Sequence, residues 1–217
     1  MAAATIVLKF CLCIECFQFY SPSFLHVNTS ARKLCGITNS IDIELISALD
    51  INAVGFNLYD KSKRFVDLLK VKELIASLPE QYQIVLIFVN HQKEFVSDCL
   101  KEIPKAMPQF HGDETKEYCE SFGTNYIKAI RIKSDTDLEK INQDYKNAKM
   151  LIFDSYDEKE YGGTGSVFDL NLLKDKISIP FLVAGGINES NFQDSLLLEN
   201  CIGIDVCSSV EERPGLK

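Results

Sequence analysis

Short apolar runs alternate with amphipathic segments from residue 31 to the end of this 217-residue chain. Several of the runs, such as residues 84–89, are apolar at every position. Continuous apolar runs are typical of parallel strands that are buried on both faces. The segments between the runs repeat apolar residues at the spacing of one helix face, as Leu68, Val71 and Ile75 do. This alternation predicts an α/β fold with a parallel sheet.

The number of runs decides between the possible α/β architectures. Eight runs predict a closed (β/α)8 TIM barrel, whereas a doubly wound open sheet usually has fewer strands and one early glycine fingerprint. No helix-like segment follows the eighth run, so we expect the barrel to lack its final helix. The expected strands are residues 32–37, 53–58, 83–89, 106–110, 125–131, 149–154, 180–184 and 202–207. The expected helices lie near residues 40–50, 65–78, 92–102, 114–121, 137–147, 168–176 and 189–198.

Residues 1–30 differ from the rest and are interpreted as an apolar N-terminal extension of a catalytic domain at 31–217. Lys9 and Glu15 interrupt the extension, which has neither the length of a membrane span nor the basic start of a signal peptide. Three cysteines at 11, 13 and 16 are spaced as soft-metal ligands, but no fourth ligand pairs with them. Residues 5–20 could cover the flank left bare by the missing helix, or both ends could reflect an imperfect gene model.

Composition limits the classes of partner. The net charge is -8, and no basic patch with interleaved aromatics occurs, which argues against nucleic-acid binding. An anionic substrate must therefore be held by local groups. The chain has eight cysteines, but it is too long and too apolar to need disulfides for stability. Most of them are interpreted as buried, reduced thiols of a cytoplasmic protein.

Reactive side chains fall where the predicted strands end, and in such barrels the chemistry takes place at these ends. Cys35 ends the first strand and Asp154 ends the sixth, so a thiolate base and a carboxylic acid could flank one small substrate. His111 follows the fourth strand. Arg64 follows the second and is a candidate carboxylate clamp. Each residue alone also fits a structural role, as a buried thiol, a cap, a loop histidine or a solvated charge.

Small residues follow the last two strands. Gly185 and Gly186, with Ser208 and Ser209, could surround a phosphate, because the loops after strands seven and eight are the usual phosphate position in this fold. The alternative is that the glycines only permit tight turns, but their position after these two strands favours phosphate binding.

A glycine-rich loop follows the sixth strand. Gly163, Thr164 and Gly165 are interpreted as a mobile flap over the substrate, with a plain flexible loop as the alternative.

Taken in order, these segments resemble the phosphoribosylanthranilate isomerase family of tryptophan biosynthesis. The resemblance extends over about residues 31–217. It is carried by residues 33–38, 55–56, 62–64, 88–90, 109–114, 128–131, 153–155, 162–169, 184–186 and 203–206. The family has a (β/α)8 barrel and catalyses an Amadori rearrangement of N-(5-phosphoribosyl)anthranilate to 1-(2-carboxyphenylamino)-1-deoxyribulose 5-phosphate.

The resemblance implies a role for each candidate. Asp154 is the expected general acid and Cys35 the general base. Arg64 is expected to hold the anthranilate carboxylate, while His111 and Asp205 line the substrate site. The glycines and serines after the last two strands are expected to bind phosphate.

The resemblance also implies cofactors and partners. No metal or organic cofactor is expected, since a Schiff base of the substrate supplies the electron sink. The expected partner is the phosphorylated aminosugar substrate, with no nucleic acid or membrane. The protein is expected to be a cytoplasmic monomer or homodimer, and it is a candidate for association with other tryptophan-pathway enzymes.

Two other functions stay open at this stage. The family usually has Ser-Ser-Gly after the eighth strand, where this chain has Cys207, Ser208 and Ser209. This departure and the missing helix would suit a non-catalytic barrel that only binds a phosphorylated ligand or a partner. Another phosphosugar enzyme, such as a pentose-phosphate epimerase, would need metal-binding histidines at strand ends. Only His111 lies at one, and His91 lies just beyond the third strand.

Overall fold

The described part of the chain forms a closed barrel of eight parallel strands. The computed structural model describes residues 31–47, 49–155 and 168–217. Each strand pairs with the next in sequence, and the last strand pairs with the first. The strands are β1 (Ala31–Cys35), β2 (Ala53–Asn57), β3 (Gln83–Phe88), β4 (Met107–Phe110), β5 (Ile127–Ile132), β6 (Met150–Ser155), β7 (Phe181–Val183) and β8 (Cys201–Val206). The prediction of a (β/α)8 barrel is confirmed.

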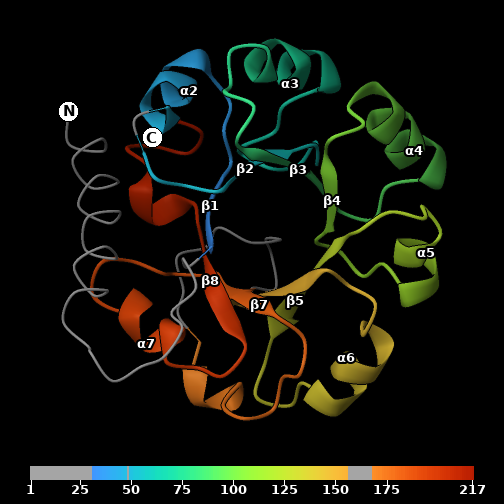
Figure 1. The fold of residues 1–217 in the computed structure, drawn as a ribbon, viewed down its shortest axis with the longest axis vertical. Coiled ribbons are helices and arrows are strands. Elements are labelled where there is room, and N and C mark those ends of the chain that lie inside the picture. The colour runs from blue at the N-terminus through green and yellow to red at the C-terminus, as the bar shows by residue number, and fades with distance from the viewer. Residues whose placement is uncertain (1–30, 48, 156–167) are drawn as a thin grey trace.

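Helices lie outside the ring of strands (Figure 1). Polar caps start several of them, as where Asp67 accepts a hydrogen bond from the N–H of Lys70 at 2.7 Å. In the described residues, none of the helices is long and apolar enough to cross a bilayer. The α-helices are α2 (Ser40–Ile46), α3 (Leu68–Ile75), α4 (Lys93–Glu102), α5 (Lys116–Glu120), α6 (Leu138–Asp144) and α7 (Phe192–Leu196). Two short 3-10 helices are η1 (Leu170–Leu172) and η2 (Ser208–Val210).

Most expected elements occur within a few residues of their predicted ends, but one is wrong. The helix expected at 168–176 is only the 3-10 turn η1. A run of alternating apolar and polar residues there was too short and too rich in Asp and Asn to sustain an α-helix. Where the structure is described, no α-helix follows β8, as expected. The proposed covering role of residues 5–20 and the cysteines at 11, 13 and 16 lie outside the described residues.

Two apolar cores follow from the alternation of side chains along the strands. The larger core packs the outer face of the strands against the helices. The smaller one fills the barrel interior and includes Val85 and Ile87 of β3 and Ile127 and Ala129 of β5. Cys35 packs against this interior core. Side chains that face inward near the strand ends therefore reach the mouth of the barrel.

The barrel closes where β8 meets β1. Lys33 is in register with Asp205, and Leu34 with Val206. A side chain at Gly203 would place its Cβ 1.8 Å from the carbonyl oxygen of Ala31, so only glycine permits this approach. Closure thus brings the residues after β8 next to Cys35.

Candidate active site

One cavity at the carboxyl ends of the strands contains the predicted site residues that the structure describes. Its lining includes Cys35 from β1, His111 after β4 and Asp154 from β6. Arg64 and Asp205 also line it, as do both predicted glycines after β7 and both serines after β8. The barrel brings these residues together because parallel strands present their carboxyl ends at the same face.

Cys35 lies above a buried ion pair. Nζ of Lys33 donates a hydrogen bond to Oδ2 of Asp205 at 2.7 Å, and both side chains are almost fully buried. Burial lowers the pKa of Lys33, but the charge and hydrogen bond of Asp205, together with the charges of Cys35 and Cys207, outweigh burial and leave that pKa above its usual value. The ammonium group stays charged beside the thiol, and its charge acts to lower the pKa of Cys35.

A second thiol, Cys207, contacts Cys35 across the junction of β1 and β8. The hydrogen bond between the two thiols, followed by burial, holds the pKa of Cys35 well above its usual value. The same hydrogen bond and the charge of Lys217 lower the pKa of Cys207 against the effect of burial. Cys207 therefore loses its proton before Cys35 does. Cys207 lies in an apolar run of the sequence, but it is only half-buried and lines the cavity.

Replacing Cys207 with serine should shift the pH dependence of catalysis. A base must be deprotonated to act, and Cys207 raises the pKa of Cys35 through its hydrogen bond and its charge. Without that thiol the pKa of Cys35 falls, so the rising limb of kcat/KM should move to lower pH. Steady-state rates between pH 6 and pH 10 measure the shift. A limb that stays in place, or moves to higher pH, would contradict this coupling.

Asp154 lies beside His111. Oδ1 of Asp154 accepts a hydrogen bond from the N–H of Ser155 at 2.8 Å. Oδ2 lies 3.2 Å from Nε2 of His111, although the angle falls short of a hydrogen bond. Such contacts often tighten only when substrate is bound. The amide of Gln109 lies 2.9 Å from Nδ1 of His111 and fixes the orientation of the ring.

Gly185 allows the loop after β7 to approach Asp154. Its φ is +69°, and a Cβ there would lie 2.6 Å from both Oδ1 of Asp154 and the backbone nitrogen of Ser155. Glycine is therefore required both for the backbone conformation and for the close approach. The loop that carries the candidate phosphate site is thereby held against the candidate acid.

The rim after β7 and β8 offers unpaired backbone donors. In the described part of the chain, no group accepts a hydrogen bond from the N–H groups of Gly185, Gly186, Ser208 or Ser209. Free N–H groups that converge at a loop or at a helix start are suited to bind an anion. One oxygen of Asp205, Oδ1, is also buried without a partner and lies in the lining of the same cavity.

Comparison with known proteins identifies the family. The family model described as N-(5'phosphoribosyl)anthranilate (PRA) isomerase matches residues 32–217. The chain belongs to the PRA isomerase family. It is 37% identical over 185 residues to the N-(5'-phosphoribosyl)anthranilate isomerase of Legionella pneumophila (strain Corby), covering 85% of this chain and 89% of that protein.

Solved structures of PRA isomerases share the fold. The phosphoribosyl anthranilate isomerase of Thermus thermophilus aligns with a TM-score of 0.77 and 29% identity, covering 86% of this chain and 92% of that chain. Another was solved with reduced 1-(o-carboxyphenylamino)-1-deoxyribulose 5-phosphate (rCdRP). It aligns with a TM-score of 0.73 and 28% identity, covering 87% of this chain and 92% of that chain. The family match includes every residue that lines the cavity described above.

Several residues that contact the lining of the cavity were missed from the sequence. Lys33 lies two positions before Cys35 in β1, and Gln109 lies two positions before His111, which directly follows β4, so each points to the same side as that residue. This period of two was a usable signal. Glu211 binds Arg64 through Nε and Nη2 at 2.6–3.0 Å, and no sequence pattern linked these two residues.

Two further expectations concern the flap over the substrate and the alternative of a metal-dependent epimerase. Gly163, Thr164 and Gly165, the expected flap, lie outside the described residues. His91, the second histidine needed for a metal-dependent epimerase, is already bound by the backbone. Its Nδ1 accepts from the N–H of Val89, and its Nε2 contacts the carbonyl oxygen of Leu58. The described residues also contain no group of three or more potential metal ligands.

Proposed function

We propose that this protein converts N-(5-phosphoribosyl)anthranilate to 1-(2-carboxyphenylamino)-1-deoxyribulose 5-phosphate. The observation that carries this proposal is that Cys35 of β1 and Asp154 of β6 line the same cavity. An isomerisation of this kind moves hydrogen within one molecule and needs one acid and one base. Membership of the PRA isomerase family supports the same reaction.

We assign the first step to Asp154. It donates a proton to the furanose ring oxygen as the bond between that oxygen and C1 breaks. The lone pair of the anthranilate nitrogen then forms the C=N bond of a Schiff base. The contact of 3.2 Å between His111 and Asp154 supports a proton-donating role, because the imidazole can orient the carboxyl and exchange a proton with it.

Cys35 performs the second step in this proposal. It removes the proton from C2, and the electrons of that bond form a C1=C2 double bond while the Schiff base nitrogen becomes an amine. The resulting enolamine tautomerises, so that C2 becomes a ketone and C1 gains a proton. The charge of Lys33 opposes the hydrogen bond and the burial that raise the pKa of Cys35, and so favours the thiolate that this step needs.

Binding groups in the lining of the cavity fit the carboxylate and the phosphate of the substrate. Arg64 would hold the anthranilate carboxylate. The free N–H groups after β7 and β8 would hold the phosphate. Asp205 would accept a hydrogen bond from a sugar hydroxyl through its unpaired Oδ1. The described cysteines are all free, which supports a location in the reducing cytoplasm.

A fluorescence assay tests the proposed function. Freshly made N-(5-phosphoribosyl)anthranilate should lose its fluorescence faster with the protein than by spontaneous decay, and chromatography should identify the ribulose product. A folded protein that binds rCdRP but gives no turnover would instead support the binding-only alternative. A folded protein that neither binds rCdRP nor turns over substrate would reject both functions.

A further inference from the structure

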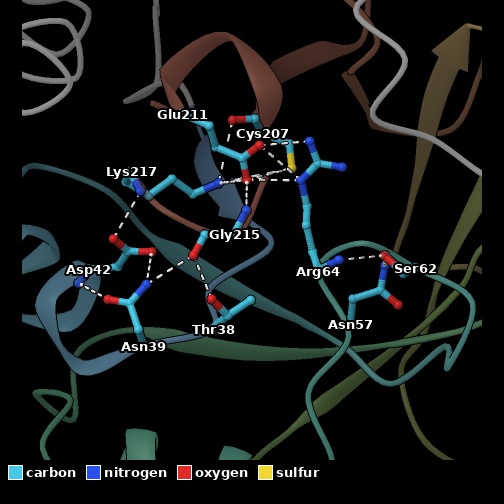
Figure 2. Close-up of polar contacts among 10 residues, drawn as sticks. All are labelled: Thr38, Asn39, Asp42, Asn57, Ser62, Arg64, Cys207, Glu211, Gly215 and Lys217. Atoms are coloured by element: carbon cyan, nitrogen blue, oxygen red, sulfur yellow. Dashed lines mark hydrogen bonds and ion pairs between the residues drawn. The ribbon is translucent and has the colours of Figure 1, made fainter. Parts of the chain in front are cut away.

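Glu211, in the segment that follows η2, binds two cations at once. Its carboxylate accepts hydrogen bonds from Nε of Arg64 at 2.8 and 3.0 Å and from Nη2 at 2.6 Å. Its Oε1 also accepts from Nζ of Lys217 at 2.9 Å and from the N–H of Gly215 at 3.2 Å. Figure 2 shows Glu211 between Arg64 on one side and Lys217 on the other. The carboxylate therefore connects the loop after β2 to the last residues of the chain.

This cluster of charged side chains is buried. The side chains of Arg64, Glu211 and Lys217 are 10%, 3% and 1% exposed. Burial raises the pKa of Glu211, but the hydrogen bonds from Arg64 and the charge of Lys217 outweigh burial and bring that pKa below its usual value. The Glu211 carboxylate therefore stays ionised between Arg64 and Lys217.

The geometry leaves one edge of the Arg64 guanidinium available. A guanidinium can form paired hydrogen bonds along its Nε–Nη edge and along its Nη–Nη edge. Glu211 occupies the first edge. In the described residues no group accepts from Nη1, and Figure 2 shows this nitrogen pointing away from Glu211. A second carboxylate can therefore bind Arg64 end-on without displacing Glu211.

We propose that Glu211 is a positioning residue that fixes Arg64 and thereby sets the preference of the cavity for ligands with an aromatic carboxylate. This inference rests on the proposed function. An arginine held in one orientation loses less side-chain freedom when the ligand binds, so affinity for the carboxylate increases.

The contacts of Glu211 on the side away from Arg64 support a positioning role. The N–H of Lys217 donates to Oδ1 of Asp42 in α2 at 3.0 Å, and Nδ2 of Asn39 donates to the carbonyl oxygen of Gly215 at 2.9 Å. Figure 2 shows these contacts beside Thr38. Glu211 is therefore fixed to the α2 start, and a rigid carboxylate can in turn hold Arg64.

The loop after β2 holds the backbone of Arg64 independently of Glu211. Oγ of Ser62 accepts from the N–H of Arg64 at 3.1 Å and from Nδ2 of Asn57 at 3.0 Å. Loss of Glu211 should therefore release the guanidinium without releasing the loop.

The test compares two ligands in a Glu211→Gln variant. An amide keeps the size of the side chain but offers one acceptor oxygen in place of two, so the paired contact is lost. We expect rCdRP to bind roughly 10- to 100-fold more weakly, while inorganic phosphate binds as in the wild type. KM for N-(5-phosphoribosyl)anthranilate should rise by a similar factor, with kcat within about 3-fold. Equal weakening of both ligands would show a merely structural role and overturn the proposal.

A matched control and a double-mutant cycle sharpen the test. Glu102 forms an exposed ion pair of the same length, 2.6 Å, with Lys72, so Glu102→Gln should leave both affinities unchanged. If Glu211 acts through Arg64, adding Glu211→Gln to an Arg64→Lys variant should weaken rCdRP little further. Independent, multiplying effects would contradict the proposal. Glu211→Asp gives the same comparison if the glutamine variant does not fold.

Failure of this inference can be distinguished from failure of the proposed function. A wild-type protein that turns over substrate, with rCdRP affinity unchanged by Glu211→Gln, rejects the positioning role alone. A wild-type protein without turnover and without rCdRP binding rejects the function on which the inference rests.

Discussion

Replacing Asp154 with asparagine should lower kcat for N-(5-phosphoribosyl)anthranilate by about 10²- to 10⁴-fold, the usual contribution of a positioned acid. An amide cannot supply the proton that the ring oxygen needs. The variant should fold, because asparagine has the size of aspartate and its oxygen can still accept the hydrogen bond from Ser155 at 2.8 Å. Steady-state kinetics measures the loss, and rCdRP binding checks that the cavity persists.

A control for this prediction is available on α4. Asp98 forms an exposed ion pair with Lys101, far from the cavity lining, so Asp98→Asn should keep wild-type activity. An Asp154→Asn variant with kcat within about 10-fold of the wild type would contradict the role of Asp154, since that loss is smaller than general acid catalysis accounts for.

Replacing Cys35 with serine should give a loss of similar size, about 10²- to 10⁴-fold in kcat. A hydroxyl ionises far less readily than a thiol, so serine at the end of β1 makes a poor base. Ring opening by Asp154 does not depend on Cys35 and should persist. Removal of the C2 proton should then become the slow step, so substrate deuterated at C2 should react more slowly than ordinary substrate in this variant.

The isotope comparison separates the two roles. In Asp154→Asn, ring opening is slow, and deuterium at C2 should have little effect. A large isotope effect in the Asp154 variant, together with none in the Cys35 variant, would reverse the assignment of acid and base. Cys201 provides the control, because it is a half-buried thiol at the start of β8 outside the cavity lining, and Cys201→Ser should retain activity.

Much of the barrel could be predicted because its elements have strong local signals. Buried parallel strands need apolar side chains on both faces, so all eight strands stood out as apolar runs. The ends of elements were less certain, since capping and packing decide them. The segment at 168–176 shows this limit, because its apolar residues pack on the core from a single 3-10 turn.

Part of the candidate site could also be predicted, because the strands that carry it have strong local signals. The fold class places every strand end at one face, so Cys35, His111 and Asp154 could be put together without knowing any distance. Residues that act on these three were harder to find. In the sequence, Gln109 is not distinguished from other residues of a buried strand. Only the structure places its amide nitrogen 2.9 Å from Nδ1 of His111.

The sequence by itself determined the barrel, the face that carries the chemistry and the family to which the chain belongs. Its periodicity and strand-end residues are local properties, and local properties can be read along a chain. Only the tertiary structure decided which thiol is the more acidic and what holds Arg64. Cys207 lies 172 positions from Cys35, and Glu211 lies 147 positions from Arg64. Closure of β8 onto β1 makes both contacts, and the pKa of each group depends on those neighbours.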